Sequence, residues 1–304
     1  LQKPDGKYGR EQSGGKESPS RKVFNVFNIL LMLVIGFICI YPFLYVVFAS
    51  FSDAAQFFQY NGVLLAPKGF STAAYKEVFK NGDILRGYGN TIFVVVVGTA
   101  LNIVLTALGA YFLSRKNVML KKPIMMMILL TMYISGGLIP SYLNVRSMGL
   151  YQSYWALILP GAISTMNLII MRSAFEAIPE SLEDAARVDG ANHFVILFQI
   201  VLPLSKATVA VLVLYYGLAH WNDWFAPMIY LQGAPQKYPL QLILRNMLID
   251  NQMVDSASGG NDQFLIFETM KYAVIVVSTL PMLIFYPFVQ KYFDKGVMVG
   301  SVKG

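Results

Sequence analysis

Long apolar stretches constrain this chain more than any other feature of its sequence. A helix needs about 20 consecutive apolar residues to cross the hydrocarbon core of a bilayer, and a backbone surrounded by lipid must satisfy its own hydrogen bonds. Six stretches meet this requirement, at about 24–50, 89–114, 123–143, 155–172, 198–221 and 265–290. The sequence therefore predicts an all-α integral membrane protein with six transmembrane helices, its membrane domain at 23–290.

The composition supports this class and excludes several kinds of site. Hydrophobic residues make up 56% of the 304 residues and charged residues 13%, whereas a soluble domain averages about 45–50% and about 25%. The single cysteine, Cys39, excludes a disulfide framework and a cysteine-based metal site. His193 and His220 lie far apart without ligand-like spacing. The net charge of +7 would suggest nucleic acid in a soluble protein, but here it flanks apolar runs and indicates orientation.

Basic residues are concentrated on one side of the predicted spans. Six spans place both termini on the same side, and loops rich in Lys and Arg remain in the cytoplasm. The richer side comprises the 1–22 tail, the second-to-third and fourth-to-fifth loops, and the 291–304 tail; the poorer side carries only Lys68, Lys76, Lys80, Arg86, Arg146, Lys237 and Arg245. We therefore expect both tails to be cytoplasmic. The poorer side shows no dense basic patch that would demand an anionic substrate.

Two long loops, 51–88 and 225–264, are expected on the outer side. Both are too polar and too interrupted by Gly and Pro to span a membrane. The second loop contains one amphipathic segment, in which apolar residues share a helical face: Leu240, Ile243, Leu244, Met247 and Leu248. Such a helix would lie on the membrane, receive a partner or pack on the domain itself, and we favour packing.

An acidic stretch, SLEDAARVDGANHFVILFQIVLPL, interrupts the apolar chain from Ser181 to Leu204. Pro179 suits a first helical position and Gly190 suits the position just past the end, so we expect a short capped helix at about 179–190. Glu183 and Arg187 are spaced for an i,i+4 pair. One face would be small rather than apolar, with Leu182, Ala185, Ala186 and Asp189. A plain connecting helix with a solvated acidic face is the alternative.

No catalytic machinery or ATP site stands out. A P-loop requires G-x-x-x-x-G-K-[ST], but Gly6-Lys7 and Gly15-Lys16 are followed by Tyr and Glu. His220 and Asp223 could face together on a helix, yet no nucleophile or third ligand accompanies them. Spans one to five carry no acidic or basic residue near their middle, which argues against a carrier driven by protons or sodium.

The acidic stretch resembles the EAA loop of ABC importer membrane subunits. Asp184-Ala185-Ala186 stands for the E-A-A triplet, Asp189-Gly190-Ala191 for D-G-A, and Leu202-Pro203-Leu204 completes the motif. The triplet begins with Asp rather than Glu, although Glu183 precedes it. Other segments resemble carbohydrate permeases of the maltose type in order and spacing: Gly69-Phe70-Ser71, Gly89-Asn90-Thr91, the run Ala110 to Arg115, Tyr154-Trp155-Ala156, and Trp221-Asn222-Asp223.

The C-terminal tail KGVMVGSVKG resembles a subgroup that contains lipopolysaccharide-type and polyuronide (alginate-like) oligosaccharide importers. This resemblance implies the transmembrane domain of a type I ABC importer in a bacterial inner membrane. It implies a heterodimer with a sister permease, a separate ATPase dimer that holds ATP and Mg, and a solute-binding protein that delivers the oligosaccharide. No cofactor is implied in this chain. The acidic stretch would be the coupling helix that contacts the ATPase, through Glu183, Asp184, Ala185, Ala186, Asp189 and Gly190.

Three questions remain open at this level. Either Glu183 or Asp184 would make the main ATPase contact. Intramembrane polar and aromatic residues suggest a substrate path, with Tyr133, Asn167, Tyr216 and Trp221 as candidates, although such residues also join helices to one another. The competing functions are a secondary sugar carrier that works without an ATPase and a membrane enzyme or scaffold.

Overall fold

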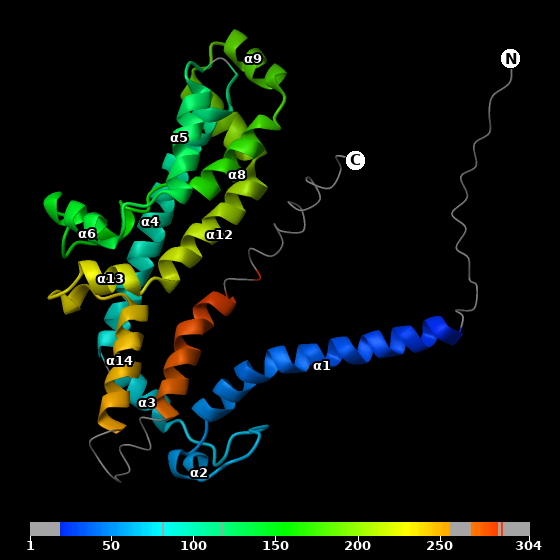
Figure 1. Ribbon diagram of the computed structural model, residues 1–304, viewed down its shortest axis with the longest axis vertical. Helices are drawn as coiled ribbons and strands as arrows, with labels where there is room; N and C mark the ends of the chain where they lie inside the picture. The colour runs from blue at the N-terminus through cyan, green and yellow to red at the C-terminus, as the bar shows by residue number, and fades with distance from the viewer. Residues whose placement is uncertain (1–18, 81, 117, 256–268, 285–286, 288–304) are drawn as a thin grey trace.

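The computed structural model describes residues 19–80, 82–116, 118–255, 269–284 and 287. The chain is helical throughout this part (Figure 1). No strand occurs in it, and one isolated bridge joins Ser52 to Phe70. Both expected tails, apart from residues 19–22, and the start of the expected sixth span at 265–268 lie outside the described residues.

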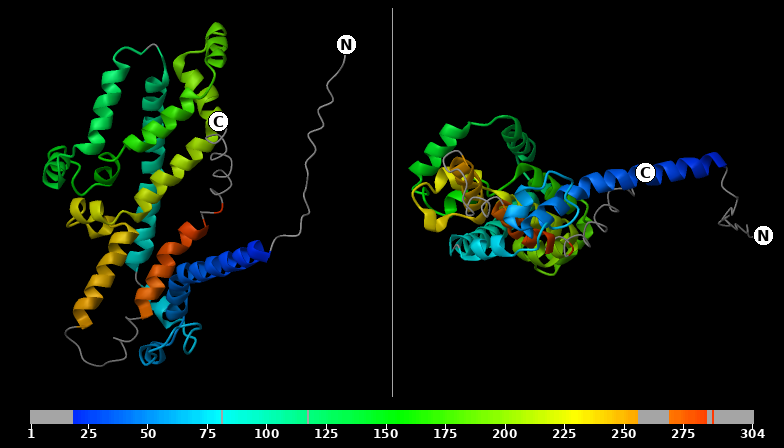
Figure 2. Two further views of the ribbon diagram at one scale, coloured as in Figure 1. Left: turned by 45° about the vertical axis from the view of Figure 1, so that its right-hand side comes forward. Right: turned by 90° about the horizontal axis from the view of Figure 1, so that it is seen from below.

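The first helix stands away from the other helices. Helix α1, Pro19–Ser50, projects from the body of the molecule in every view (Figure 2). Its 31-residue apolar segment Ser20–Ser50 is long enough to span a membrane, and none of its most apolar window is buried inside the chain. Lipid or another membrane protein must therefore cover this helix.

Helix α4, Gly82–Ser114, is the central element of the body. It is the second helix long enough to span a membrane, and it packs against α8, Thr165–Glu176, and α12, Lys206–Asn222. Small residues let the helices approach closely: a Cβ atom added at Gly98 would lie 2.6 Å from Nε2 of His220.

The expected span at 123–143 is broken. The structure forms α5, Lys121–Tyr133, and α6, Leu138–Ser147, which meet at a bend of 115°. Gly136 and Gly137 cause the break, because Gly137 adopts a φ of +90° that side chains with a Cβ avoid. Apolar composition alone does not reveal this turn.

The expected span at 155–172 is also interrupted. A short helix α7, Trp155–Ile158, is separated from α8 by residues 159–164, which are not helical. Pro160 lacks an N–H group and restricts the residue before it. Ser164 then begins α8 by accepting a hydrogen bond from the N–H of Asn167.

The expected span at 198–221 begins later than predicted. The chain from His193 to Leu204 forms α10, His193–Val195, a π-helical turn, Ile196–Val201, and α11, Leu202–Leu204. It meets α12 at an 87° bend next to Ser205. Of these segments, only α12 therefore forms part of a straight span, and it covers the expected span from Lys206 onward.

Shorter helical elements complete the described chain. They comprise α2, Ala54–Phe58, α3, Ala73–Lys80, α13, Phe225–Tyr230, the 3-10 turn Pro235–Lys237 and α14, Leu240–Asp255. Leu240, Ile243 and Leu244 of α14 are buried against α4 and the helix Thr269–Ile284. The favoured prediction that this amphipathic helix packs on the domain is confirmed.

Candidate functional site

Helix α9, Glu180–Val188, lies at one tip of the molecule, far from α2, α3 and α14 (Figure 1). Pro179 precedes the first helical residue rather than occupying it, with extended backbone angles. At the other end, Gly190 adopts a φ of +81°. Its N–H donates to the carbonyl of Arg187 at 3.0 Å, and the N–H of Ala191 donates to that of Ala186 at 2.9 Å. This pair of bonds is a Schellman cap, so the expected short, self-contained helix is present.

One buried ion pair attaches α9 to the rest of the chain. Glu183 and Arg115, which follows α4, form an ion pair between side chains that are only 3% and 14% exposed. Arg115 also donates to Oγ of Ser114 and to the carbonyl of Phe175 at 3.3 Å, and its guanidinium lies 4.8 Å from the ring centre of Tyr111. Arg115 thus joins the ends of α4, α8 and α9.

The expected Glu183–Arg187 pair does not form. Glu183 turns inward to Arg115, and Arg187 instead pairs with Asp184 at 3.6 Å, where both side chains are well exposed. A carboxylate that is buried needs a cation at close range. At the i,i+4 position Arg187 is exposed to solvent, so Glu183 pairs instead with Arg115, which is distant in sequence.

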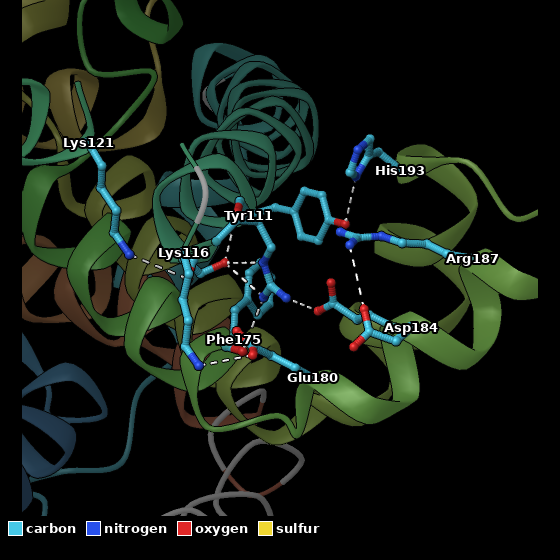
Figure 3. A network of polar contacts seen from close by, with 11 residues as sticks. Tyr111, Lys116, Lys121, Phe175, Glu180, Asp184, Arg187 and His193 are labelled. Atoms are coloured by element: carbon cyan, nitrogen blue, oxygen red, sulfur yellow. Dashed lines mark hydrogen bonds and ion pairs between the residues drawn. The ribbon is translucent and has the colours of Figure 1, made fainter. Parts of the chain in front are cut away.

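Further polar contacts surround the ion pair (Figure 3). Lys116 pairs with Glu180 at 2.9 Å, and the hydroxyl of Tyr111 lies 3.2 Å from Nδ1 of His193. The shared carboxylate of Glu176 accepts from Lys121 at 3.1 Å and from Arg172 at 2.9 Å.

The surroundings of Glu176 and Arg115 explain the direction in which the pKa of each side chain is shifted. Burial raises the pKa of Glu176, but hydrogen bonds and charges from Arg172 and Lys121 outweigh burial and leave its pKa below the usual value. Desolvation lowers the pKa of Arg115, while Tyr111 and the nearby carboxylates oppose that shift. Both groups therefore remain charged at neutral pH.

The other side of α9 is open. Asp184, Ala185, Asp189 and Gly190 are exposed, and Val188 is 88% exposed. Leu182 is 45% exposed, whereas Ala186 is half-buried against the chain's own core. The predicted small-residue face is thus split: Ala186 packs inward, and the remaining residues form a small apolar surface with acids at its edge.

Sequence reasoning missed Arg115 as a site residue. The sequence placed it among the charges that set orientation and at the end of the run from Ala110 that resembles carbohydrate permeases, but gave it no contact, although it directly follows the serine that ends α4. Its partner lies 68 residues away in the chain, so no local pattern connects the two. Val188, the most exposed residue of α9, was missed for a different reason, because it falls outside the i, i+3, i+4, i+7 set.

The four substrate-path candidates do not form one cluster. Tyr133 is 85% exposed at the end of α5. Tyr216 is buried, and its hydroxyl accepts from the N–H of Ser164 at 3.0 Å and contacts Oγ1 of Thr106 at 2.7 Å. Asn167 is buried one turn beyond Ser164, and Trp221 is buried near the end of α12 next to Tyr88.

A second neutral network also holds the break between α7 and α8. Nδ2 of Asn102 donates to the carbonyls of Gly161 at 3.1 Å and Ala162 at 2.8 Å. Its Oδ1 therefore accepts from Nε2 of His220 at 2.8 Å. Asp223, three residues after His220, caps the first N–H groups of α13.

Neutral side chains thus satisfy the non-helical backbone between α7 and α8. No group of three His, Cys, Asp or Glu residues suited to a metal ion occurs within the described ranges.

Comparison with known proteins places the chain in a family. The model of the family described as binding-protein-dependent transport system inner membrane component matches residues 15–299. The polygalacturonan/rhamnogalacturonan transport system permease protein YtcP of Bacillus subtilis (strain 168) is 40% identical over 285 residues, which cover 93% of this chain and 99% of YtcP. Protein LplC of the same organism is 41% identical over 285 residues, covering 93% and 96%.

A solved structure agrees with these relatives. In the crystal structure of a bacterial ABC transporter involved in the import of the acidic polysaccharide alginate, one chain is 33% identical and superposes with a TM-score of 0.84, covering 92% of this chain and 99% of that chain. The family match, the identities and this superposition extend over nearly the whole sequence. The chain belongs to the binding-protein-dependent transport system inner membrane component family.

Proposed function

We propose that this chain is the membrane-spanning permease subunit of an ATP-driven importer of oligosaccharides. Within this proposal the oligosaccharide arrives on a solute-binding protein, and a sister permease completes the membrane pore. The observation that carries the proposal is α9, a capped nine-residue helix at the tip of the molecule with one anchored face and one open face. A permease that has no P-loop of its own needs such a surface to contact the separate ATPase whose ATP hydrolysis drives transport.

The two acidic candidates on α9 take different roles in this proposal. Glu183 is buried in its ion pair with Arg115 of the same chain, so its role is to position the helix. Asp184 is exposed and held only by a long contact with Arg187, so it is free to meet a cation on the ATPase. Leu182, Ala185 and Val188 supply the apolar contact, and ATP with Mg would reside on the partner.

An acidic substrate is supported by chemistry at the outer end. Arg146, Lys237 and Arg245 each lie over an aromatic ring, at 6.0, 5.9 and 4.6 Å from the ring centres of Tyr151, Tyr154 and Trp224. Within the described residues none of the three forms an ion pair. The sequence showed no dense basic patch, but the fold sets each of these cations over a ring, and cations and rings suit carboxylates and sugar faces. The name of YtcP refers to polygalacturonan and rhamnogalacturonan, and the solved transporter is described with the acidic polysaccharide alginate.

The proposed orientation follows from the place of α9 and from the distribution of basic residues along the sequence. With α9 on the cytoplasmic side, both termini are cytoplasmic, and α2, α3 and α14 face the solute-binding protein. The apolar surface of α1, which this chain leaves uncovered, is available to lipid and to the sister permease. The location is the inner membrane of a bacterium.

Transport by the reconstituted complex tests the function. Vesicles containing this chain, its sister permease, the ATPase and the solute-binding protein should accumulate an acidic oligosaccharide only with ATP. If the purified chain alone moves the oligosaccharide down its gradient at the same rate, the secondary-carrier alternative is correct.

A matched pair of variants tests the docking surface. Val188→Asp places a charge on the open face of α9 and should abolish co-purification of the ATPase. Val63→Asp makes the same change at a residue that is 63% exposed in the outer loop and should leave co-purification intact. Equal ATPase recovery with both variants would refute docking through α9.

A further inference from the structure

A pocket in the outer half of the molecule combines an aromatic ring, an apolar wall and a cation that forms no ion pair with any described residue. It has a volume of about 380 Å³ and lies between Trp224, α14 and the helix Thr269–Ile284. We propose that this pocket binds a uronate unit of an acidic saccharide, with Arg245 as the carboxylate contact and Trp224 as the platform for the sugar ring. This inference rests on the proposed function and names a site for its substrate.

The cation and the ring are held by different elements. Trp224 follows the end of α12 and precedes α13, and Arg245 projects from the second turn of α14. The guanidinium carbon lies 4.6 Å from the centre of the indole ring. Stacking fixes the plane of the guanidinium while leaving its N–H groups free to point at a planar anion.

Arg245 has no acidic partner among the residues that the structure describes. It is half-buried, and within the described residues no carboxylate lies within ion-pair distance. Asp223, next to Trp224 in sequence, is occupied by the N–H groups of Phe225 and Ala226. By contrast Arg86, elsewhere on the outer side, pairs with Asp83 at 3.0 Å. A half-buried cation that no described carboxylate neutralises is suited to bind an anion from outside.

The pocket has the size and lining of a small-ligand site. Its volume falls within the range of about 300–1,000 Å³ that is usual for such sites. The wall is mainly apolar, from Leu244, Leu248 and Val274, with Gln241 and Ser278 as further polar groups. An apolar wall suits the C–H face of a sugar ring, and an amide suits its hydroxyls. A single guanidinium can take one carboxylate in a bidentate contact.

Binding is tested directly by fluorescence on the purified transporter complex. Trigalacturonate should quench tryptophan emission, and Trp224→Phe should remove most of that quenching while Trp155→Phe leaves it. Galactotriose, the neutral probe, should quench at least tenfold more weakly. Equal quenching by the two sugars, or quenching that persists in Trp224→Phe, overturns the proposal.

Transport separates this site from the proposed function itself. Arg245→Gln should raise the KM for trigalacturonate about tenfold, through loss of a charge-assisted contact, and Arg245→Lys should recover part of the loss. If wild-type vesicles import saccharide with ATP but Arg245→Gln behaves as wild type, this site is wrong and the function stands. If wild-type vesicles import no saccharide, the function fails. An effect of Arg245→Gln that follows the anionic lipid content rather than substrate charge assigns the pocket to a lipid headgroup.

Discussion

Two groups of cations, at opposite ends of this molecule, are held in different ways. Near α9, five cations are each paired with a carboxylate, in the network formed by Arg115, Lys116, Lys121, Arg172 and Arg187. At the outer end, Arg146, Lys237 and Arg245 lie over aromatic rings and have no carboxylate partner within the described residues. The difference separates charges used to hold the chain together from charges available to a ligand.

Charge is absent between these ends, where hydrogen bonds are neutral. Asn102 and Tyr216 form hydrogen bonds with the non-helical backbone between α7 and α8, and neither side chain takes part in an ion pair. A neutral amide or phenol loses less on leaving water than an ion does. The comparison therefore predicts three different effects. Substitutions in the ion-pair network around α9 should affect coupling to ATP hydrolysis, and substitutions among the neutral hydrogen bonds should affect stability. Substitutions of the cations that lie over rings should affect substrate binding.

The largest effect is expected from Arg115→Gln. This change leaves Glu183 charged and buried, at a cost of about 3–5 kcal/mol, so α9 should detach from α4 and α8. We expect ATP-driven transport to fall at least tenfold while basal ATPase activity of the complex persists. The measurement is the ratio of transported substrate to hydrolysed ATP.

Two controls accompany this variant. Arg187→Gln removes an exposed cation from the same helix and should change the ratio by less than about twofold. Exchange of the charges in Arg115→Glu with Glu183→Arg should restore part of the coupling. If Arg115→Gln and Arg187→Gln behave alike, the buried pair does not position α9.

The middle of the molecule should respond to Asn102→Leu by losing stability. Leucine has a similar size but leaves the carbonyls of Gly161 and Ala162 and the ring of His220 without their partner. Each such group costs about 1–3 kcal/mol. The unfolding temperature of the purified complex should therefore fall, with little change in the KM of the protein that remains folded.

Thr99→Val is the matched control for this change. Oγ1 of Thr99 is buried on the same helix and has no hydrogen-bond partner among the described residues, so its removal should be neutral or stabilising. A lower unfolding temperature for Thr99→Val than for Asn102→Leu would contradict the role given to the neutral network.

These regions differ in how far the sequence predicted them. The capped helix α9 and the packed helix α14 follow from local signals, because Gly190 and the apolar face of Leu240, Ile243 and Leu244 act within a few turns. The Arg115–Glu183 pair did not follow, since its members are brought together only by packing of α4 on α8. Apolar content also concealed the breaks at Gly137 and Pro160, because hydropathy measures solubility in lipid rather than backbone angles.

The outer end offers a smaller but charge-specific effect. Arg146 is exposed beside Tyr151, where a cation attracts anions over a distance set by salt. Arg146→Gln should raise the KM for an acidic oligosaccharide about two- to threefold at low ionic strength, and the difference should vanish in high salt. Arg86→Gln, which removes a cation already paired with Asp83, should change the KM less. The same loss in both variants would show that net charge alone matters.

The smallest effect is expected from Lys116→Gln, and it sets the limit of the comparison. Lys116 and Glu180 pair at 2.9 Å, but their side chains are 75% and 54% exposed, so water already screens them. Pairs of this kind contribute about 0–1 kcal/mol, and we expect transport per ATP within about a factor of two of wild type. A loss comparable to that of Arg115→Gln would mean that Lys116 contacts the ATPase itself. In that case pairing inside the chain would not distinguish structural charges from those available to a partner, and the contrast between the two ends would have to be drawn from burial instead.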